Sequence, residues 1–266
     1  MIPGDSDVSN DAAMGEILAD IVEEAARLIL PYWRSDLTVI RKADESPVTE
    51  ADQRGETLIL QLLARHFPDI PVVSEEDSAE NGVPTDAAGR FFLVDPLDGT
   101  KAFVRGDPNF TVNIGLIENG RSVAGAICAP VTMETWFTTP AGALKRQAGE
   151  AAAPVRVRPW PKGEAVALVS HTMKEEAAEG LQAEYGFDLR QPMDSSIKLC
   201  RIAEGAADIY PRHGPTMEWD TAAGQAILEA AGGRFATPDG SPFLYGKAEA
   251  GFRNGWFVAR GGPRED

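Results

Sequence analysis

The chain has 266 residues, 43% of them hydrophobic, which is enough for a substantial core in one large domain or two smaller ones. Its 41 acidic residues outnumber the 25 basic ones and give a formal net charge of −16. Such an acidic surface disfavours nucleic acid and anionic lipid, so a bound anion would need a local positive charge, such as a metal ion.

The sequence pattern does not predict a membrane span or a signal peptide. No apolar run approaches the roughly 20 residues of a membrane span, and the polar N-terminus does not resemble a signal peptide. We therefore expect a cytoplasmic protein without an integral membrane segment, and leave peripheral contact with the inner membrane face open. Cys128 and Cys200 lie in apolar contexts and are expected to be buried, reduced thiols.

The first half of the chain is predicted to pass from helices to strands. In chain order the pattern predicts a frayed tail at 1–10, a helix at 11–30, a strand at 37–42, a polar loop at 42–49, a helix at 50–66, and strands at 70–77 and 90–95. Two hairpins follow, one turning at Asn119-Gly120 and the other over Pro140-Ala141-Gly142.

The second half alternates between strands and helices, which favours an α/β layer. The predicted elements are a strand at 165–170, a helix at 172–185, a helix at 195–205, a strand at 207–212 and a helix at 220–233. The stretch 148–164 is rich in Ala, Pro and Gly and lacks periodicity. We therefore predict a layered α/β sandwich with an N-terminal α+β metal-binding half at 1–154 and a C-terminal α/β substrate-binding half at 155–266.

Several acidic residues stand at the ends of predicted elements. Each has a structural alternative: Asp52 and Asp220 could favour helix starts, Asp98-Gly99 could make a turn, and 75–77 could be a solvated loop. Asp95 resists such a reading, because it emerges from the apolar strand RFFLV and a buried carboxylate needs a partner.

The nearby sequence offers these acids few cations, so their convergence points to hard divalent ions, above all Mg²⁺. Two ions that share a carboxylate would lie about 4 Å apart, as in many phosphoryl-transfer sites. Gly99 and Thr100 would open a short turn or helix whose N–H groups favour a phosphate. Asp52 could accept the Thr100 proton and direct the hydroxyl oxygen towards a water.

These residues resemble a known family, the Mg²⁺-dependent, Li⁺-sensitive phosphomonoesterases that include inositol monophosphatase. DPLDGTKAF and WDTAAG match its two hallmark blocks, with SEED and TEAD upstream in the expected order. The segments LVDPLDGTKAFVRGDPNFTVNIGLI, SSIKLCRIAEG and DIYPRHGPTMEWDTAAG are most similar to the bacterial 3′(2′),5′-bisphosphate nucleotidases. The resemblance covers about residues 11–260 and implies an αβαβα sandwich of the sugar-phosphatase type.

The implied activity is hydrolysis of the 3′-phosphate of adenosine 3′,5′-bisphosphate, a by-product of sulfate transfer, to AMP and phosphate. By the same resemblance, Glu75, Asp95 and the Leu97 carbonyl would hold one Mg²⁺, and Asp95, Asp98 and Asp220 a second. A third, weaker ion would contact Glu75. The attacking water would be positioned by Glu75 and by Thr100 with Asp52 behind it, and no phosphoenzyme would form.

A bisphosphate also needs cations for the phosphate that does not react. Lys198 and Arg212 suit this need, because both precede Asp220 in the C-terminal half. The resemblance adds Ser195 and His171, and it makes Asp98, Gly99, Thr100 and Asp220 substrate contacts as well as site residues.

For some of these residues a structural explanation stays open. Lys198 could be a solvated helix lysine, Arg212 part of a surface ion pair, and His171 a structural residue. Trp219 is expected in the core, and the roles of Lys101 and His213 are left open. An inositol or histidinol phosphate phosphatase is the alternative enzyme, and a catalytically silent metal or nucleotide sensor the alternative class; a homo-oligomer is possible.

Overall fold

The computed structural model describes residues 6–35, 40–41, 47–84, 89–147 and 149–263. Its α-helices are α1 (Ser6–Ile29), α2 (Glu50–His66), α3 (Glu75–Asn81), α4 (Thr100–Arg105), α5 (Glu175–Tyr185), α6 (Ile197–Ala203) and α7 (Ala222–Ala230). Its 3₁₀-helices are η1 (Leu30–Tyr32), η2 (Glu218–Asp220) and η3 (Ala248–Ala250).

The strands form three sheets. A two-stranded sheet pairs β1 (Ile40–Arg41) with β2 (Pro47–Val48). The seven-stranded sheet has the order β3 (Val72–Ser74), β4 (Arg90–Asp98), β5 (Thr111–Glu118), β6 (Arg121–Ala129), β7 (Glu134–Thr139), β8 (Gly142–Gln147) and β9 (Ala153–Pro154). The five-stranded sheet has the order β11 (Leu189–Pro192), β10 (Val166–Val169), β12 (Ile209–Arg212), β14 (Phe257–Arg260) and β13 (Arg234–Ala236).

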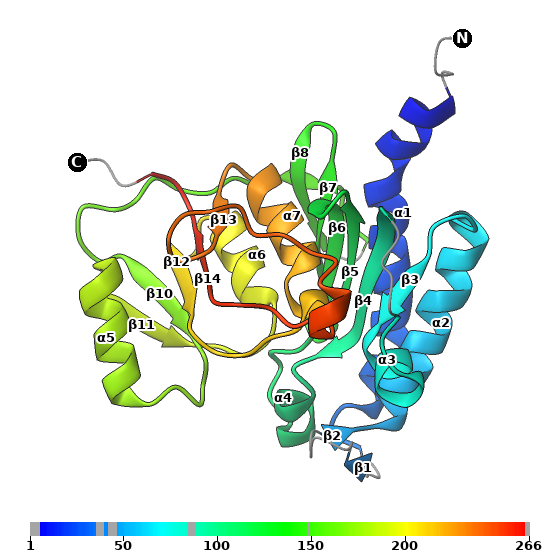
Figure 1. Cartoon of the computed structure of the whole chain (residues 1–266), viewed down its shortest axis with the longest axis horizontal. Coiled ribbons are helices and arrows are strands. Elements are labelled where there is room, and N and C mark those ends of the chain that lie inside the picture. The colour runs from blue at the N-terminus through cyan, green and yellow to red at the C-terminus, as the bar shows by residue number, and fades with distance from the viewer. Residues whose placement is uncertain (1–5, 36–39, 42–46, 85–88, 148, 264–266) are drawn as a thin grey trace.

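Helices and sheets alternate in five layers (Figure 1). Helices α1 and α2 cover one face of the seven-stranded sheet, α6 and α7 lie between the two large sheets, and α5 covers the outer face of the five-stranded sheet. The predicted αβαβα sandwich is therefore confirmed.

Local sequence signals fixed several elements as expected. Helix α2 begins and ends where it was predicted, and Thr49 starts it: Ala51 N donates to Thr49 Oγ1 at 3.2 Å, and Thr49 N donates to Asp52 Oδ2 at 2.8 Å. Asn119 and Gly120 have φ values of 50° and 77° and join β5 to β6, which confirms the first hairpin. The hairpin of β7 and β8 is confirmed too, and both cysteines are free and buried.

Other expectations were wrong or incomplete. The acids 75–77 open helix α3 instead of closing a strand, and Asp220 lies in η2, just before α7. Residues 6–10, predicted to be frayed, belong to α1, whereas 1–5 and the loop residues 42–46 lie outside the described residues. Strands β11, β13 and β14 were not predicted; the last two run antiparallel to their neighbours, so this sheet is mixed.

The proposed division at residue 154 falls where the chain leaves the seven-stranded sheet, after β9. One hydrophobic core nevertheless joins both halves, because α6 and α7 pack against both sheets. The two-part organisation stays a prediction. No helix among the described residues has the length and apolar character needed to cross a bilayer.

Close packing of α7 on the seven-stranded sheet sets the position of the C-terminal acid. A Cβ on Gly115 would lie 2.7 Å from Ala222 Cβ, and one on Gly125 2.7 Å from Ala223 Cα. Since only glycine leaves this space, the helix backbone lies directly on β5 and β6. Trp219 is buried in the core beside it, as expected, and this packing carries Asp220 to the end of β4.

Candidate active site

Three carboxylates meet at the end of β4, two from this strand and one from η2. Asp95, Asp98 and Asp220 each have an oxygen within 4.8 Å of the others. The β4–β5 register shifts between Asp95 and Asp98, and this irregularity interrupts the alternation of side chains along the strand, so both acids belong to one cluster. Asp95 is 1% exposed, which makes it the buried charge that the sequence predicted.

The surroundings of these carboxylates disfavour their charged forms. Burial, followed by repulsion from Glu75, Asp98 and Asp220, raises the pKa of Asp95 well above its usual value. Burial and then Asp98 raise the pKa of Asp220 in the same way, and burial raises that of Asp98 although Lys198 opposes it. Three converging carboxylates in need of positive charge are a donor set that fits Mg²⁺.

The opening of α4 brings a backbone turn and a hydroxyl to these acids. Gly99 has a φ of 93°, and a Cβ there would lie 3.0 Å from Asn109 O and 3.2 Å from Ser195 Cβ, so glycine is required. Thr100 Oγ1 can donate to Asp52 Oδ1 at 3.3 Å or to the Leu97 carbonyl at 3.1 Å. The predicted Thr100–Asp52 contact therefore exists, and Asp52 is 1% exposed.

Glu75 reaches the same cavity from α3. The first turn of this helix is held on α2, because Glu56 accepts hydrogen bonds from Glu76 N at 2.9 Å and Asp77 N at 2.8 Å. Glu75 lines the cavity and lies close enough to raise the pKa of Asp95. The sequence did not identify Glu56, because a mid-helix glutamate has no local signal for such a contact.

Positive charge also lines this cavity, which has a volume of about 320 Å³. Lys198 lines it and is only 4% exposed, so the solvated-lysine alternative is wrong. Lys198 Nζ donates to Met193 O at 3.3 Å and to the Ser195 carbonyl, and burial lowers its pKa to about 8.

Arg212 lines the same cavity. Its Nη2 donates to Pro215 O at 3.2 Å, while its buried Nε has no hydrogen-bond partner. Among the ion pairs of the described residues Arg212 does not occur, which argues against the surface-ion-pair alternative. A buried donor without a hydrogen-bond partner, next to carboxylates that could hold metal ions, is a place where an anion can bind.

The segment before α6 closes the cavity from the side. Ser195 has a φ of 56°, lines the cavity and accepts from Ile197 N through its Oγ at 3.3 Å. The backbone N–H of Ser196 donates to Asp98 Oδ2. The sequence missed Ser196, since a backbone donor leaves no mark in the residue type.

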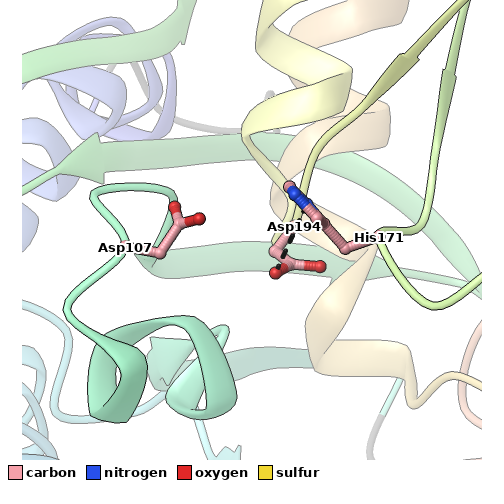
Figure 2. A group of neighbouring side chains, drawn as sticks. All are labelled: Asp107, His171 and Asp194. Atoms are coloured by element: carbon pink, nitrogen blue, oxygen red, sulfur yellow. Dashed lines mark ion pairs between the residues drawn. The ribbon is translucent and has the colours of Figure 1, made fainter.

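His171 is half-exposed and does not itself line the cavity, although its neighbours Ser170 and Thr172 do. It lies beside two acids that the sequence did not single out. Figure 2 shows Asp194 next to it and Asp107 across from them on the loop after α4. His171 Nδ1 is 3.9 Å from Asp194 Oδ2, and this same oxygen binds Arg105 Nη2 at 2.6 Å. Arg105 thus already balances Asp194 and ties α4 to the segment before α6. Lys101 also lines the cavity, with an exposed side chain.

Comparison with known proteins identifies the family to which a chain with this arrangement is similar. The family model described as "Inositol monophosphatase family" matches residues 11–259. A protein of Salmonella typhimurium named "3'(2'),5'-bisphosphate nucleotidase CysQ" is 42% identical over 218 residues, which are 82% of this chain and 87% of that one.

Solved structures of similar proteins point to the same family. The crystal structure of CysQ from Bacteroides thetaiotaomicron, titled a bacterial member of the inositol monophosphatase family, is 30% identical with a TM-score of 0.77 and covers 95% of this chain and 98% of its own. An inositol monophosphatase of Thermotoga maritima, 24% identical, shares the fold with a TM-score of 0.75 over 93% of this chain and 91% of its own. From the extent of these matches, this chain belongs to the inositol monophosphatase family.

Proposed function

We propose that this chain is a Mg²⁺-dependent phosphoric monoester hydrolase that removes the 3′-phosphate of adenosine 3′,5′-bisphosphate to give AMP and phosphate. The relatives named as 3′(2′),5′-bisphosphate nucleotidases support the substrate class. The observation that carries the proposal is the pair of cations, Lys198 and Arg212, that lines one cavity together with the acids. A substrate with a single phosphate would leave this pair without a ligand.

The acids would hold two to three Mg²⁺ ions. Asp95, Asp98 and Asp220 would share them with Glu75 and with the Leu97 carbonyl, whose lone pairs stay available when the Thr100 hydroxyl donates to Asp52. Ions bound there would lower the pKa of an attacking water and neutralise charge on the phosphoryl oxygens.

The chain's own groups would position the reactants. Asp52 accepts the Thr100 hydroxyl proton, which directs a Thr100 lone pair into the cavity, where it can orient the water together with Glu75. The N–H groups at the Gly99–Thr100 turn would bind the reacting phosphate, and Ser195, Lys198 and Arg212 the other one. Water attacks phosphorus in line, the P–O3′ bond breaks, and the ribose oxygen leaves as a hydroxyl.

The test is phosphate release from adenosine 3′,5′-bisphosphate and from inositol 1-phosphate, with and without Mg²⁺ and Li⁺. Wild-type protein should hydrolyse the bisphosphate faster, only with a divalent ion, and less in Li⁺. Lys198→Ala should lower kcat/KM for the bisphosphate by about 10- to 100-fold, the effect of losing a hydrogen bond to a charged group.

The controls separate this result from misfolding. Lys162→Ala, which removes an exposed loop lysine outside the cavity, should change neither rate. If Lys198→Ala slows both substrates equally, the bisphosphate assignment fails and an inositol or histidinol phosphate phosphatase becomes the better one. Release that persists without any divalent ion would contradict the mechanism.

A further inference from the structure

A single peptide unit lies between one of the metal-binding acids and the lysine proposed for the second phosphate. The carbonyl oxygen of Ser195 accepts a hydrogen bond from Lys198 Nζ, and the backbone N–H of Ser196 donates to Asp98 Oδ2. Because a trans peptide unit is planar, its C=O and N–H groups point in opposite directions. The Ser195–Ser196 peptide therefore joins Lys198 on one side to Asp98 on the other.

The orientation of this peptide matters for both contacts. If the unit were turned over, the Ser195 carbonyl oxygen would face the Asp98 carboxylate and the N–H group would face the Lys198 amine, so both contacts would become repulsive. Ser195 has a φ of 56°, a conformation that is unfavourable for a residue other than glycine. Local backbone preference therefore does not hold the peptide in place, and a contact from elsewhere in the chain is needed.

The side chain of Ser196 makes such a contact. Ser196 is buried and stands at the N-cap of α6, yet its hydroxyl does not cap the helix. The hydroxyl reaches β5 instead, where it donates to Asn113 Oδ1 at 2.8 Å and lies 2.8 Å from Thr111 Oγ1. Since the one hydroxyl proton of Ser196 goes to Asn113, the Thr111 hydroxyl is the donor in the second bond.

The strand that anchors Ser196 is paired with the strand that carries the acids. Thr111 and Asn113 are both buried, and residues two apart on a strand share one face. In the β4–β5 register, Thr111 lies opposite Asp98 and Asn113 lies opposite Asp95. The two hydrogen bonds of Ser196 are thus made to residues whose positions relative to the acids are set by the sheet.

We infer that Ser196 is a positioning residue that fixes the Ser195–Ser196 peptide and thereby orients Asp98 towards the metal and Lys198 towards the second phosphate. Ser196 acts through these two residues rather than by contacting the reacting atoms. The inference deepens the proposed function, on which the part concerning the phosphate rests. One hydroxyl on the sheet then serves both the metal site and the phosphate site.

The experiment measures both sites in Ser196→Ala. Mn²⁺ suits the same oxygen ligands as Mg²⁺ and reports metal binding without turnover. The Kd for Mn²⁺, from the paramagnetic resonance of the free ion, should rise by about tenfold. At saturating Mg²⁺, the ratio of kcat/KM for adenosine 3′,5′-bisphosphate to kcat/KM for inositol 1-phosphate should fall by about fivefold. Ser241→Ala, which removes an exposed hydroxyl after β13, is the matched control and should change neither value.

A pair of variants at Thr111 separates this role from a loss of folding. Thr111→Val keeps the shape of the side chain and loses its hydroxyl, so it should shift both values in the same direction as Ser196→Ala, by about threefold. Thr111→Ser keeps the hydroxyl and should leave both values close to those of the wild type.

The inference is wrong if Ser196→Ala and Thr111→Val lower only the melting temperature, or if they shift one of the two values and not the other. If the wild-type protein hydrolyses neither substrate, the proposed function fails. A weaker binding of Mn²⁺ by Ser196→Ala would then still support the role of Ser196 at Asp98, and unchanged Mn²⁺ binding would overturn it.

Discussion

The pKa of the Lys198 amine is set by where the side chain lies in the folded protein rather than by its neighbours in sequence. It lies in the first turn of α6, yet its amine is buried beneath the cavity and held by two backbone carbonyls. Burial lowers its pKa to about 8, and attraction to Asp98 opposes this shift. The lysine therefore titrates within the range in which a phosphatase is assayed.

This titration gives a pH dependence. In its proposed role the cationic amine binds the second phosphate, so kcat/KM for adenosine 3′,5′-bisphosphate should fall as pH rises through about 8, while kcat/KM for inositol 1-phosphate should show no such fall. Lys198→Arg stays charged and should lose the limb. Because the pKa of Lys198 is lower in the folded protein than its usual value of 10.5, the unfolded chain binds more protons than the folded one between about pH 8 and 10.5. The destabilisation that the buried charged amine causes is therefore relieved as pH rises through that range.

The measurement is a kcat/KM profile from pH 6 to 10 with both substrates at saturating Mg²⁺. An identical alkaline limb for the two substrates would assign it to a group other than Lys198.

At the scale of elements, the short 3₁₀-helix η2 is held by residues 246–254, which lie next to it in space although they come more than 20 residues later in the chain. Glu218, fully buried, pairs with Lys247 Nζ at 2.6 Å and accepts from Gly246 N at 2.8 Å. Asn254 Nδ2 lies 2.6 Å from Met217 O, and Met217 N donates to Asp220 Oδ2 at 2.8 Å. The segment after β13 thus fixes Asp220, the acid proposed to complete the metal site.

Glu218→Gln should therefore weaken metal binding. Its amide keeps one acceptor and loses the ion pair, so the Mg²⁺ concentration for half-maximal activity should rise by about tenfold or more, as for other residues that orient metal ligands. KM for the substrate at saturating Mg²⁺ should change little. Glu249→Gln, an exposed glutamate in η3, is the matched control. A lower melting temperature with an unchanged Mg²⁺ requirement would restrict Glu218 to a structural role.

At the scale of the whole molecule, acidic charge is concentrated where it costs stability. The chain carries a net charge of −16, and Asp95, Asp98 and Asp220 are gathered with Glu75 in partly or fully buried positions. Because the folded protein raises the pKa values of the three aspartates, it holds protons that the unfolded chain releases. Without metal, the contribution of these three aspartates to stability is greatest at low pH and is lost as pH rises through their raised pKa values.

Removing divalent ions with EDTA should therefore lower the melting temperature more at pH 8 than at pH 5. Saturating Mg²⁺, at about 100 times its Kd, should contribute about 2.7 kcal/mol, or roughly 5–10 °C for a chain of this size. Asp95→Asn should melt higher than wild type in EDTA at pH 8 and gain little from Mg²⁺. Equal stabilisation of this variant and wild type by Mg²⁺ in a thermal scan would show that Asp95 does not hold the ion.

Elements with strong local signals were predictable from sequence. Helix α2 has its Thr49 start and apolar period, and the β5–β6 hairpin has Asn119-Gly120, so both follow from interactions within a few residues. Helix α3 was missed because its seven residues are nearly all polar and its start is held by Glu56, 20 residues away. Strands β13 and β14 are three and four residues long, and pairing with each other and with β12 stabilises them.

The sequence by itself determined which residues supply the chemistry, because a carboxylate at the end of an apolar strand, a Gly-Thr turn and an Asp before an apolar helix are local patterns. Only the tertiary structure decided how they act. Segments distant in the chain pack together to produce three features: the burial of Lys198, the contacts of Glu218 that hold η2, and the hydrogen bonds that fix Ser196 on β5. Burial and charge at such contacts depend on the assembled layers, so no short stretch of sequence encodes them.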